Sequence, residues 1–214
     1  MKRPWRFIRR WGGLGNLIDG DCTVAAYYHV IMALNVLNGS SFKKIIYRLG
    51  FRVPGTKFAL KEYTAYLATL GQKPGPESGV AVDGFLNWQK AQGNVLGWAY
   101  VVPAGATLTE SALRAALDNF GGVILAGDLT STAYNQMANP WVLNAGDVPN
   151  PNLGHAVAFL DYNDTVDRIV TWGKWHAMTI AFRELCFDSA FVFVNKNDPN
   201  AQAKLKVLAT MKAA

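Results

Sequence analysis

The stretch from Gly15 to His29 reads GNLIDGDCTVAAYYH and places Cys22 at the start of an apolar segment. The apolar run continues until Asn38-Gly39, a pair typical of a helix C-terminus. We therefore predict a buried helix over about residues 21–37. Because the N-terminal end of a helix dipole favours thiolate over thiol, Cys22 is a candidate activated nucleophile.

A second segment, Leu153 to Leu160, reads LGHAVAFL and places His155 at the start of an apolar strand. An imidazole can serve as the general base for a thiol, and the two residues of such a pair meet in the fold rather than in the sequence. The two segments together predict a Cys22–His155 pair. The alternative is that Cys22 is an inert core residue, as free cysteines on apolar helices commonly are.

The composition predicts a globular protein. Half of the 214 residues are apolar and only 17% are charged, which is enough for one well-filled domain with room for two lobes. No apolar run reaches the roughly 18 residues of a membrane span, so none is expected. The N-terminus lacks the apolar region of a signal peptide. Two cysteines, Cys22 and Cys186, make no disulfide framework, so we expect free thiols in a reducing, cytoplasmic setting.

The first fourteen residues form a basic, aromatic arm in a chain of net charge +6. The arm either packs on its own domain or docks on a protein partner in a larger assembly. No nucleic-acid-binding motif is visible, so a nucleic-acid partner is not expected. The basic and aromatic residues of the arm are Lys2, Arg3, Trp5, Arg6, Phe7, Arg9, Arg10 and Trp11.

Hydrophobic periodicity predicts a helix-rich first half followed by strands, which is typical of the α+β class. Thr107 and Glu110 have the spacing of a capping box at the start of a helix that ends at Phe120. We expect a basic arm (1–14), one domain (15–195) and a helical tail (196–214), with residues 134–152 as a loop. Further helices are predicted over 40–49, 56–70, 82–92, 179–187 and 201–212, and strands over 97–102, 123–129, 155–162, 168–171 and 190–194.

The order of these segments resembles the papain-like cysteine peptidase superfamily. In that family the nucleophilic cysteine opens a long helix and a polar residue six positions earlier helps to form the oxyanion hole; Asn16 occupies that position here. A Gly-His segment then opens a strand, as Gly154-His155 does. The next strand usually ends Asn-Ser-Trp-Gly, and this chain has Val170-Thr171-Trp172-Gly173. The resemblance covers residues 12 to 195 and is closest to small papain-like proteins encoded by bacteriophages and bacteria.

The resemblance implies a two-lobed fold, with a helical N-terminal lobe and an antiparallel β-rich C-terminal lobe, and acyl transfer on a peptide or related amide. Cys22 would be the nucleophile, His155 the base, and Asn16 an oxyanion donor. The family's asparagine that orients the histidine is missing. Thr171 lies nearest to its place and could accept the hydrogen bond, whereas Asp161 is a weaker candidate. Trp172 and Gly154 are expected to line the substrate site.

The remaining histidines have other interpretations. His29 lies two helical turns after Cys22, about 10 Å along the axis, which is too far for a base. His176 is either a loop residue near the cleft or a structural one. The three histidines and two cysteines have no metal-ligand spacing, so neither a metal nor another cofactor is expected.

The leading hypothesis is therefore a cysteine peptidase-type domain that uses a Cys-His pair. The alternative is a weakly active or inactive papain-like scaffold, serving as a structural or interaction protein of a phage virion. The basic arm and the missing asparagine motivate this alternative.

Overall fold

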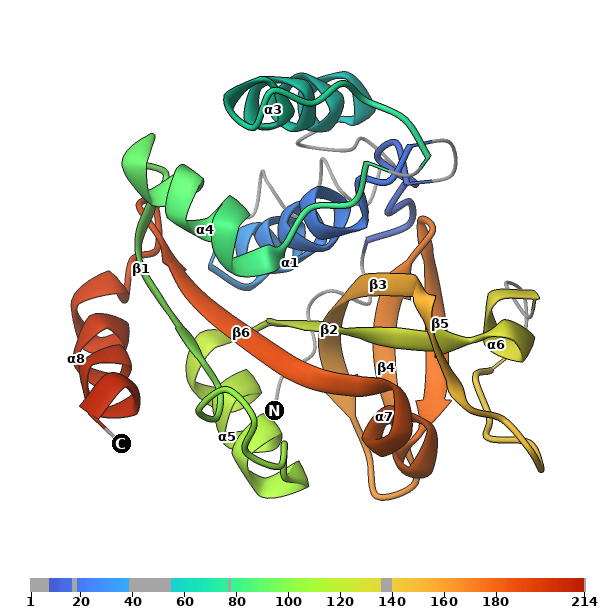
Figure 1. Ribbon diagram of the computed structural model, residues 1–214. Coiled ribbons are helices and arrows are strands. Elements are labelled where there is room, and N and C mark those ends of the chain that lie inside the picture. Colours follow the sequence, from blue (N-terminus) through green and yellow to red (C-terminus); the bar gives the residue numbers. More distant parts are fainter. Residues whose placement is uncertain (1–7, 17–18, 39–54, 77, 136–139, 214) are drawn as a thin grey trace.

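The computed structural model describes residues 8–16, 19–38, 55–76, 78–135 and 140–213. Helices dominate the first half of the chain, and the second half supplies most of a six-stranded sheet (Figure 1). The predicted α+β class is confirmed. The helices are α1 (Cys22–Asn38), α3 (Thr56–Thr69), α4 (Val82–Ala91), α5 (Glu110–Phe120), α6 (Ser131–Asn135), α7 (Ile180–Cys186) and α8 (Ala201–Ala213). The strands are β1 (Val95–Tyr100), β2 (Val123–Thr130), β3 (Pro149–Tyr162), β4 (Val166–Thr171), β5 (Lys174–Thr179) and β6 (Phe187–Asn195).

The sheet is antiparallel and has the strand order β1-β6-β2-β3-β4-β5. Side chains alternate between its two faces, as the pleat requires. On β3, Ala156 and Ala158 belong to the core beneath α1, whereas Val157 and Phe159 belong to the core on the opposite face. The sheet is therefore covered on both sides.

Helix α1 lies between the sheet and helices α3 and α4 (Figure 1). Its residues are apolar around most of the circumference, which fits a helix buried on several sides. Helices α5 and α7 pack on the opposite face of the sheet, and α8 contributes Leu208 to that core. This arrangement agrees with the papain-like architecture that the resemblance implies, because Cys22 opens a helix of one layer and His155 lies on a strand of the other.

The two ends of the described chain pack against the domain. Ile8, Trp11 and Leu14 are buried in the core that surrounds α1. At the other end, a Cβ on Gly97 of β1 would lie 3.1 Å from the side chain of Leu205 on α8. The described part of the predicted arm thus packs on its own domain, while residues 1–7 lie outside the described residues.

Three local expectations were wrong or incomplete. The helix before Phe120 has Thr109 as its N-cap, whose side chain accepts from the Ala112 N–H, so the capping box at Thr107 is wrong. The expected loop over 134–152 contains the end of α6 and the start of β3. Strand β5 was missed. The helix predicted over 40–49 lies outside the described residues.

The missed strand follows an unusual two-residue turn. Thr171 pairs with Lys174, so Trp172 and Gly173 alone connect β4 to β5. Both have positive φ, 47° at Trp172 and 76° at Gly173, as a type I′ hairpin turn requires. Such turns normally carry Asn-Gly, and tryptophan gives no sequence signal for one. The turn points back toward the first half of the chain, where Gly12 forms an antiparallel bridge with Gly173.

Candidate active site

Cys22 is the first residue of α1, and its side chain borders two cavities. The first, of about 220 Å³, we call the Asn16 cavity, and the second, of about 350 Å³, the Asp188 cavity. Cys22, Gly154 and His155 line both of them. The two cavities are therefore the halves of one cleft that meets at the cysteine and the histidine.

His155 is held by Thr171 of the neighbouring strand. The Nε2 atom of His155 lies 2.7 Å from the Thr171 hydroxyl oxygen. Strand pairing explains the contact. Because Ala158 pairs with Val170 in antiparallel strands, Thr171 comes opposite Val157. His155 lies two residues before Val157 on β3, so its side chain is on the same face of the sheet as Thr171. The structure therefore places Thr171 where the resemblance implies an orienting residue.

Aromatic rings surround the imidazole of His155. Trp172 stacks on it, with ring centroids 5.0 Å apart and an interplanar angle of 29°. Trp141 contacts it edge-on at 6.3 Å. Burial, followed by the nearby His176, lowers the pKa of His155 from 6.5 to about 4. The imidazole is consequently neutral at physiological pH and can accept a proton.

Asn16 lies in the loop that precedes α1 and lines the Asn16 cavity together with Cys22 and His155. Its side chain is 9% exposed. The backbone N–H of Asn16 donates to the Gly13 carbonyl at 2.9 Å, which makes the loop a tight turn. Asn16 thus borders the same cavity as Cys22 and His155.

The thiol of Cys22 does not have the low pKa that its helix position predicts. Burial raises the pKa above the ordinary 9.0, and the adjacent Asp21 raises it further, while a hydrogen bond from the Ala156 backbone lowers it. The expectation of a resting thiolate is therefore not met. Since the pKa of His155 is low, the resting pair is a neutral thiol and a neutral imidazole.

Asp21, the residue before Cys22, is fully buried. Among the described residues, no group donates a hydrogen bond to either of its carboxyl oxygens. Desolvation, followed by the charge of Asp19, raises the pKa of Asp21 from 3.8 to about 8. A Cβ on Gly15 would collide with this carboxyl group, so glycine is required there.

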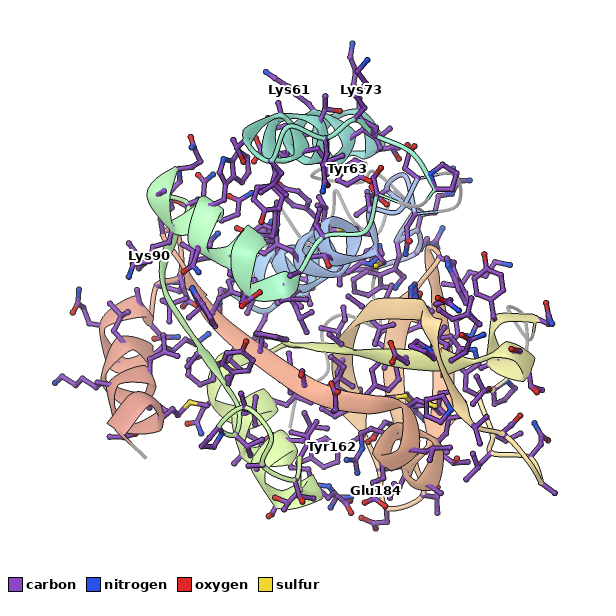
Figure 2. All side chains as sticks on the ribbon, in the orientation of Figure 1. Lys61, Tyr63, Lys73, Lys90, Tyr162 and Glu184 are labelled. Carbon is purple, nitrogen blue, oxygen red and sulfur yellow. The ribbon has the colours of Figure 1, made fainter. Side chains whose placement is uncertain are left out.

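Residues 75–76 and 78–81, which precede α4, form one wall of the cleft, and contacts from Gly20, α1 and α3 hold them. Thr23 donates to the Val80 carbonyl at 2.7 Å, and Gly20 donates its N–H to the Gly75 carbonyl at 2.9 Å. Tyr63 points inward from α3, whereas Lys61 and Lys73 point outward (Figure 2). The Tyr63 hydroxyl donates a hydrogen bond to the Ser78 carbonyl at 2.7 Å. The wall is fixed to the helix that carries the thiol.

Carboxylates line both halves of the cleft. Asp19 lies at the Asn16 cavity, which is also lined by Asn16, Asn152, Leu129, Tyr134 and Trp172. Asp128 and Asp188 line the Asp188 cavity. Although the chain has a net charge of +6, no lysine or arginine of the described residues lines either half. The cleft is thus acidic in a basic protein.

The other candidates from the sequence lie outside the cleft. His176 is buried behind the tryptophans, with its ring 5.6 Å from Trp141 and 6.0 Å from Trp172. Asp161 pairs with Arg168 at 3.1 Å and does not line either cavity. His29 donates from Nε2 to a backbone carbonyl, as a structural histidine would. In the described part of the chain, no cluster of three His, Cys, Asp or Glu could hold a metal ion.

Sequence reasoning missed several residues of the site. Trp141 lies in the segment expected to be a loop, yet it is fully buried beside His155. Tyr134, Asp128 and Asp188 carry no motif. Asp128 of β2 and Asp188 of β6 meet at the cleft through strand pairing, since β2 lies between β3 and β6 in the sheet, and Tyr134 reaches it from α6.

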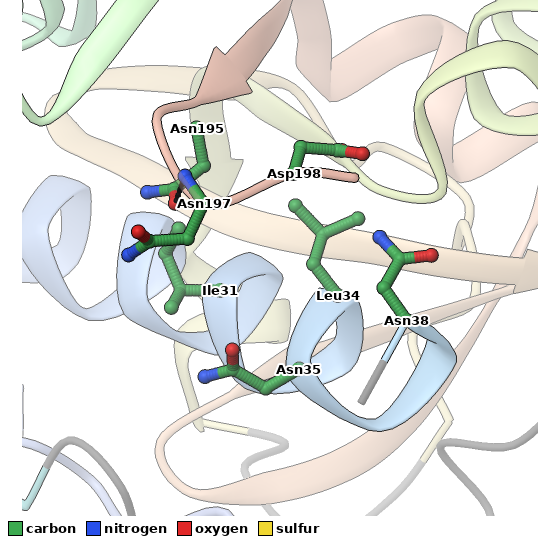
Figure 3. A pocket seen from close by; sticks show the side chains of 7 residues that line it. All are labelled: Ile31, Leu34, Asn35, Asn38, Asn195, Asn197 and Asp198. Carbon is green, nitrogen blue, oxygen red and sulfur yellow. Dashed lines mark hydrogen bonds between the residues drawn. The ribbon is translucent and has the colours of Figure 1, made fainter. Parts of the chain in front are cut away.

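A separate small cavity lies at the far end of α1 (Figure 3). Its polar lining consists of the amides of Asn35, Asn38, Asn195 and Asn197 with the Asp198 carboxylate, which pairs with Lys204 at 2.6 Å. With a volume of about 40 Å³ and no nucleophile or base, it offers no chemistry to compete with the cleft. None of the described helices is long and apolar enough to cross a membrane.

No protein-family model matches the chain, and no curated protein sequence matches it. Solved structures that are similar to it at low identity include three peptidases. A protein described as a C39-like peptidase, from Bacillus anthracis, is 11% identical over 84% of this chain and 90% of its own, with a TM-score of 0.48. Xylellain, a cysteine protease from Xylella fastidiosa, is 14% identical over 81% and 79%, with a TM-score of 0.46. A cysteine protease from Carica candamarcensis is 15% identical over 87% and 91%, with a TM-score of 0.45. Because these likenesses are remote, function must be derived from this chain's own residues.

Proposed function

We propose that the chain is a papain-like cysteine peptidase that hydrolyses a peptide or related amide through Cys22 and His155. The observation that carries the proposal is the shared cleft: a thiol at a helix N-terminus and a neutral imidazole border the same two cavities. The described residues leave space beside both groups, so a substrate can reach them. The hydrogen bond between His155 and Thr171 supports a base of fixed orientation.

The first half of the reaction forms an acyl-enzyme. With Nε2–H donating to Thr171, the Nδ1 atom of His155 is free to take the Cys22 thiol proton as sulfur attacks the carbonyl carbon. The Cys22 backbone N–H and the Asn16 side-chain amide stabilise the oxyanion. The tetrahedral intermediate then collapses, and His155 gives its proton to the departing amine.

The second half restores the enzyme. A water molecule loses a proton to His155 and attacks the thioester carbon, and the carbon–sulfur bond breaks to release the acid. The thiolate takes the proton back from His155. Because the resting pair is neutral, proton transfer accompanies attack rather than preceding it, so the base is essential in this scheme.

Hydrolysis of a fluorogenic peptide library tests the proposal. We expect cleavage by the wild type and by Cys186→Ser, and none by Cys22→Ser or His155→Ala. Cys186→Ser is the matched control, since it removes the other thiol, which is buried away from the cleft. Equal hydrolysis by Cys22→Ser would contradict the proposal. The alternative of an inactive scaffold in a virion predicts that no variant, including the wild type, cleaves any peptide.

A further inference from the structure

His29 is a buried histidine that the proposed mechanism does not use. It lies on α1 and is 1% exposed, and its Nε2–H donates to the Gly12 carbonyl at 2.9 Å. Trp11 packs edge-on against its ring at 5.8 Å and also contacts Trp175 of β5 at 5.3 Å. Burial lowers the pKa of His29 to about 4, so the ring stays neutral and keeps a defined donor. The helix that carries the thiol is thereby tied to the preceding loop.

Gly12 in turn touches the turn that carries Trp172. It forms an antiparallel bridge with Gly173, and a Cβ on Gly173 would lie 2.5 Å from the Gly12 carbonyl carbon and 2.6 Å from the Gly13 nitrogen. We call this backbone contact between Gly12 and Gly173 the glycine clasp. A residue with a Cβ atom at position 173 could not approach Gly12 so closely.

The glycine clasp supports the backbone conformation of Trp172. Trp172 adopts a φ of 47°, a conformation that is strained for a bulky residue and persists only where its surroundings enforce it. In that conformation its ring stacks on His155. On the other side of the clasp, the Gly13 carbonyl accepts a hydrogen bond from the Asn16 backbone N–H. One contact therefore connects the supports of the proposed base and of the proposed oxyanion donor.

We propose that His29 is a positioning residue that acts through the glycine clasp. Its hydrogen bond fixes Gly12, Gly12 fixes Gly173, and the turn then holds Trp172 against His155 while the loop keeps Asn16 at the cleft. The structural part stands on the contacts themselves, and the effect on turnover rests on the proposed function. The Gly12 and Gly173 carbonyls and N–H groups take no part in the chemistry.

The test compares three variants by NMR. His29→Leu introduces an apolar side chain of similar size that has no hydrogen-bond donor, whereas His29→Gln retains an N–H donor. Leu117→Ala is the control for general destabilisation, because Leu117 is buried in the core on the opposite face of the sheet. The readout is the ring-current shift that Trp172 imposes on the carbon-bound protons of the His155 ring. We expect this shift in the wild type, His29→Gln and Leu117→Ala, and its loss in His29→Leu.

Peptide hydrolysis supplies the second readout. We expect His29→Leu to lower kcat about tenfold with KM nearly unchanged, and His29→Gln to restore most of the rate. An unchanged ring-current shift in His29→Leu, or an equal loss in Leu117→Ala, overturns the positioning role even if the wild type is an active peptidase. A wild type that cleaves no peptide but shows the expected shifts overturns the proposed function and leaves the positioning role standing. If His29→Leu does not fold, failure of His29→Gln to preserve the shift overturns the role in the same way.

Discussion

Replacing Asp21 with asparagine removes the buried carboxyl group next to the nucleophile while keeping its shape. In the folded protein, desolvation and then the charge of Asp19 raise the pKa of Asp21 to about 8, whereas an unfolded chain has a value near 3.8. Between these two values the unfolded chain has lost the proton and the folded chain keeps it. The contribution of Asp21 to the free energy of unfolding therefore falls as pH rises, by about 1.4 kcal/mol per pH unit.

The window from pH 6.5 to pH 8 contains most of this loss. His29 and His155 have folded pKa values of about 4 and unfolded values near 6.5, so each contributes an opposite gain of about 0.4 kcal/mol across the window. The wild type and an Asp21 variant share this gain, so it cancels when the two are compared. Burial raises the thiol pKa of both Cys22 and Cys186 above 9.0, so neither titrates below pH 8 in either state. The expected loss for Asp21 over the window is about 1.5 kcal/mol, flattening above pH 8.

Chemical denaturation at several pH values within this window measures the loss. We expect Asp21→Asn to gain about 1.5 kcal/mol relative to the wild type between pH 6.5 and pH 8, because only the wild type has this carboxyl group while both proteins share the histidine contributions. Asp164→Asn is the control, because that side chain is 99% exposed, and it should follow the wild type. Parallel pH dependences of wild type and Asp21→Asn would refute the assignment of a protonated carboxyl at this position.

Other variants test the cleft. Thr171→Val should lower kcat/KM about fivefold, the value of one lost hydrogen bond of about 1 kcal/mol, and Thr171→Ser should retain activity. Asp188→Asn should reduce any preference for lysine or arginine in the substrate, measured with paired cationic and neutral peptides, and the difference should shrink at high salt. Gly173→Ala should lower Tm more than Gly105→Ala, since both have positive φ but only Gly173 touches another backbone. The acidic limb of the kcat/KM profile should lie near pH 4, because His155 accepts a proton only when neutral.

The elements that could be predicted from the sequence are those whose signals are local. The apolar run after Cys22 predicted α1 to within a residue at each end, and the apolar run after His155 predicted the C-terminal part of β3. The spacing between His155 and Thr171 was also informative, because a short hairpin fixes the register of neighbouring strands. These features depend on periodicity and on turn length, both of which a single sequence displays.

The remaining features depend on contacts between distant segments. Nothing local to Trp172 predicts a positive φ, since the glycine clasp that supports it comes from residue 12. The helix position of Cys22 predicts a low thiol pKa, but burial outweighs the helix dipole. Trp141 was taken for a loop residue because polar residues surround it, although its ring lies in the core.

The most direct test of a nucleophilic Cys22 paired with His155 is covalent labelling with a peptidyl chloromethyl ketone, located by mass spectrometry of the digested protein. We predict one adduct per chain on Cys22 in the wild type, none on Cys186, none in Cys22→Ser, and much slower labelling in His155→Ala. Cys186 should stay unlabelled because it is buried and burial raises its pKa to about 11. Labelling of Cys186 at an equal rate, or labelling of Cys22 that does not depend on His155, would contradict the account.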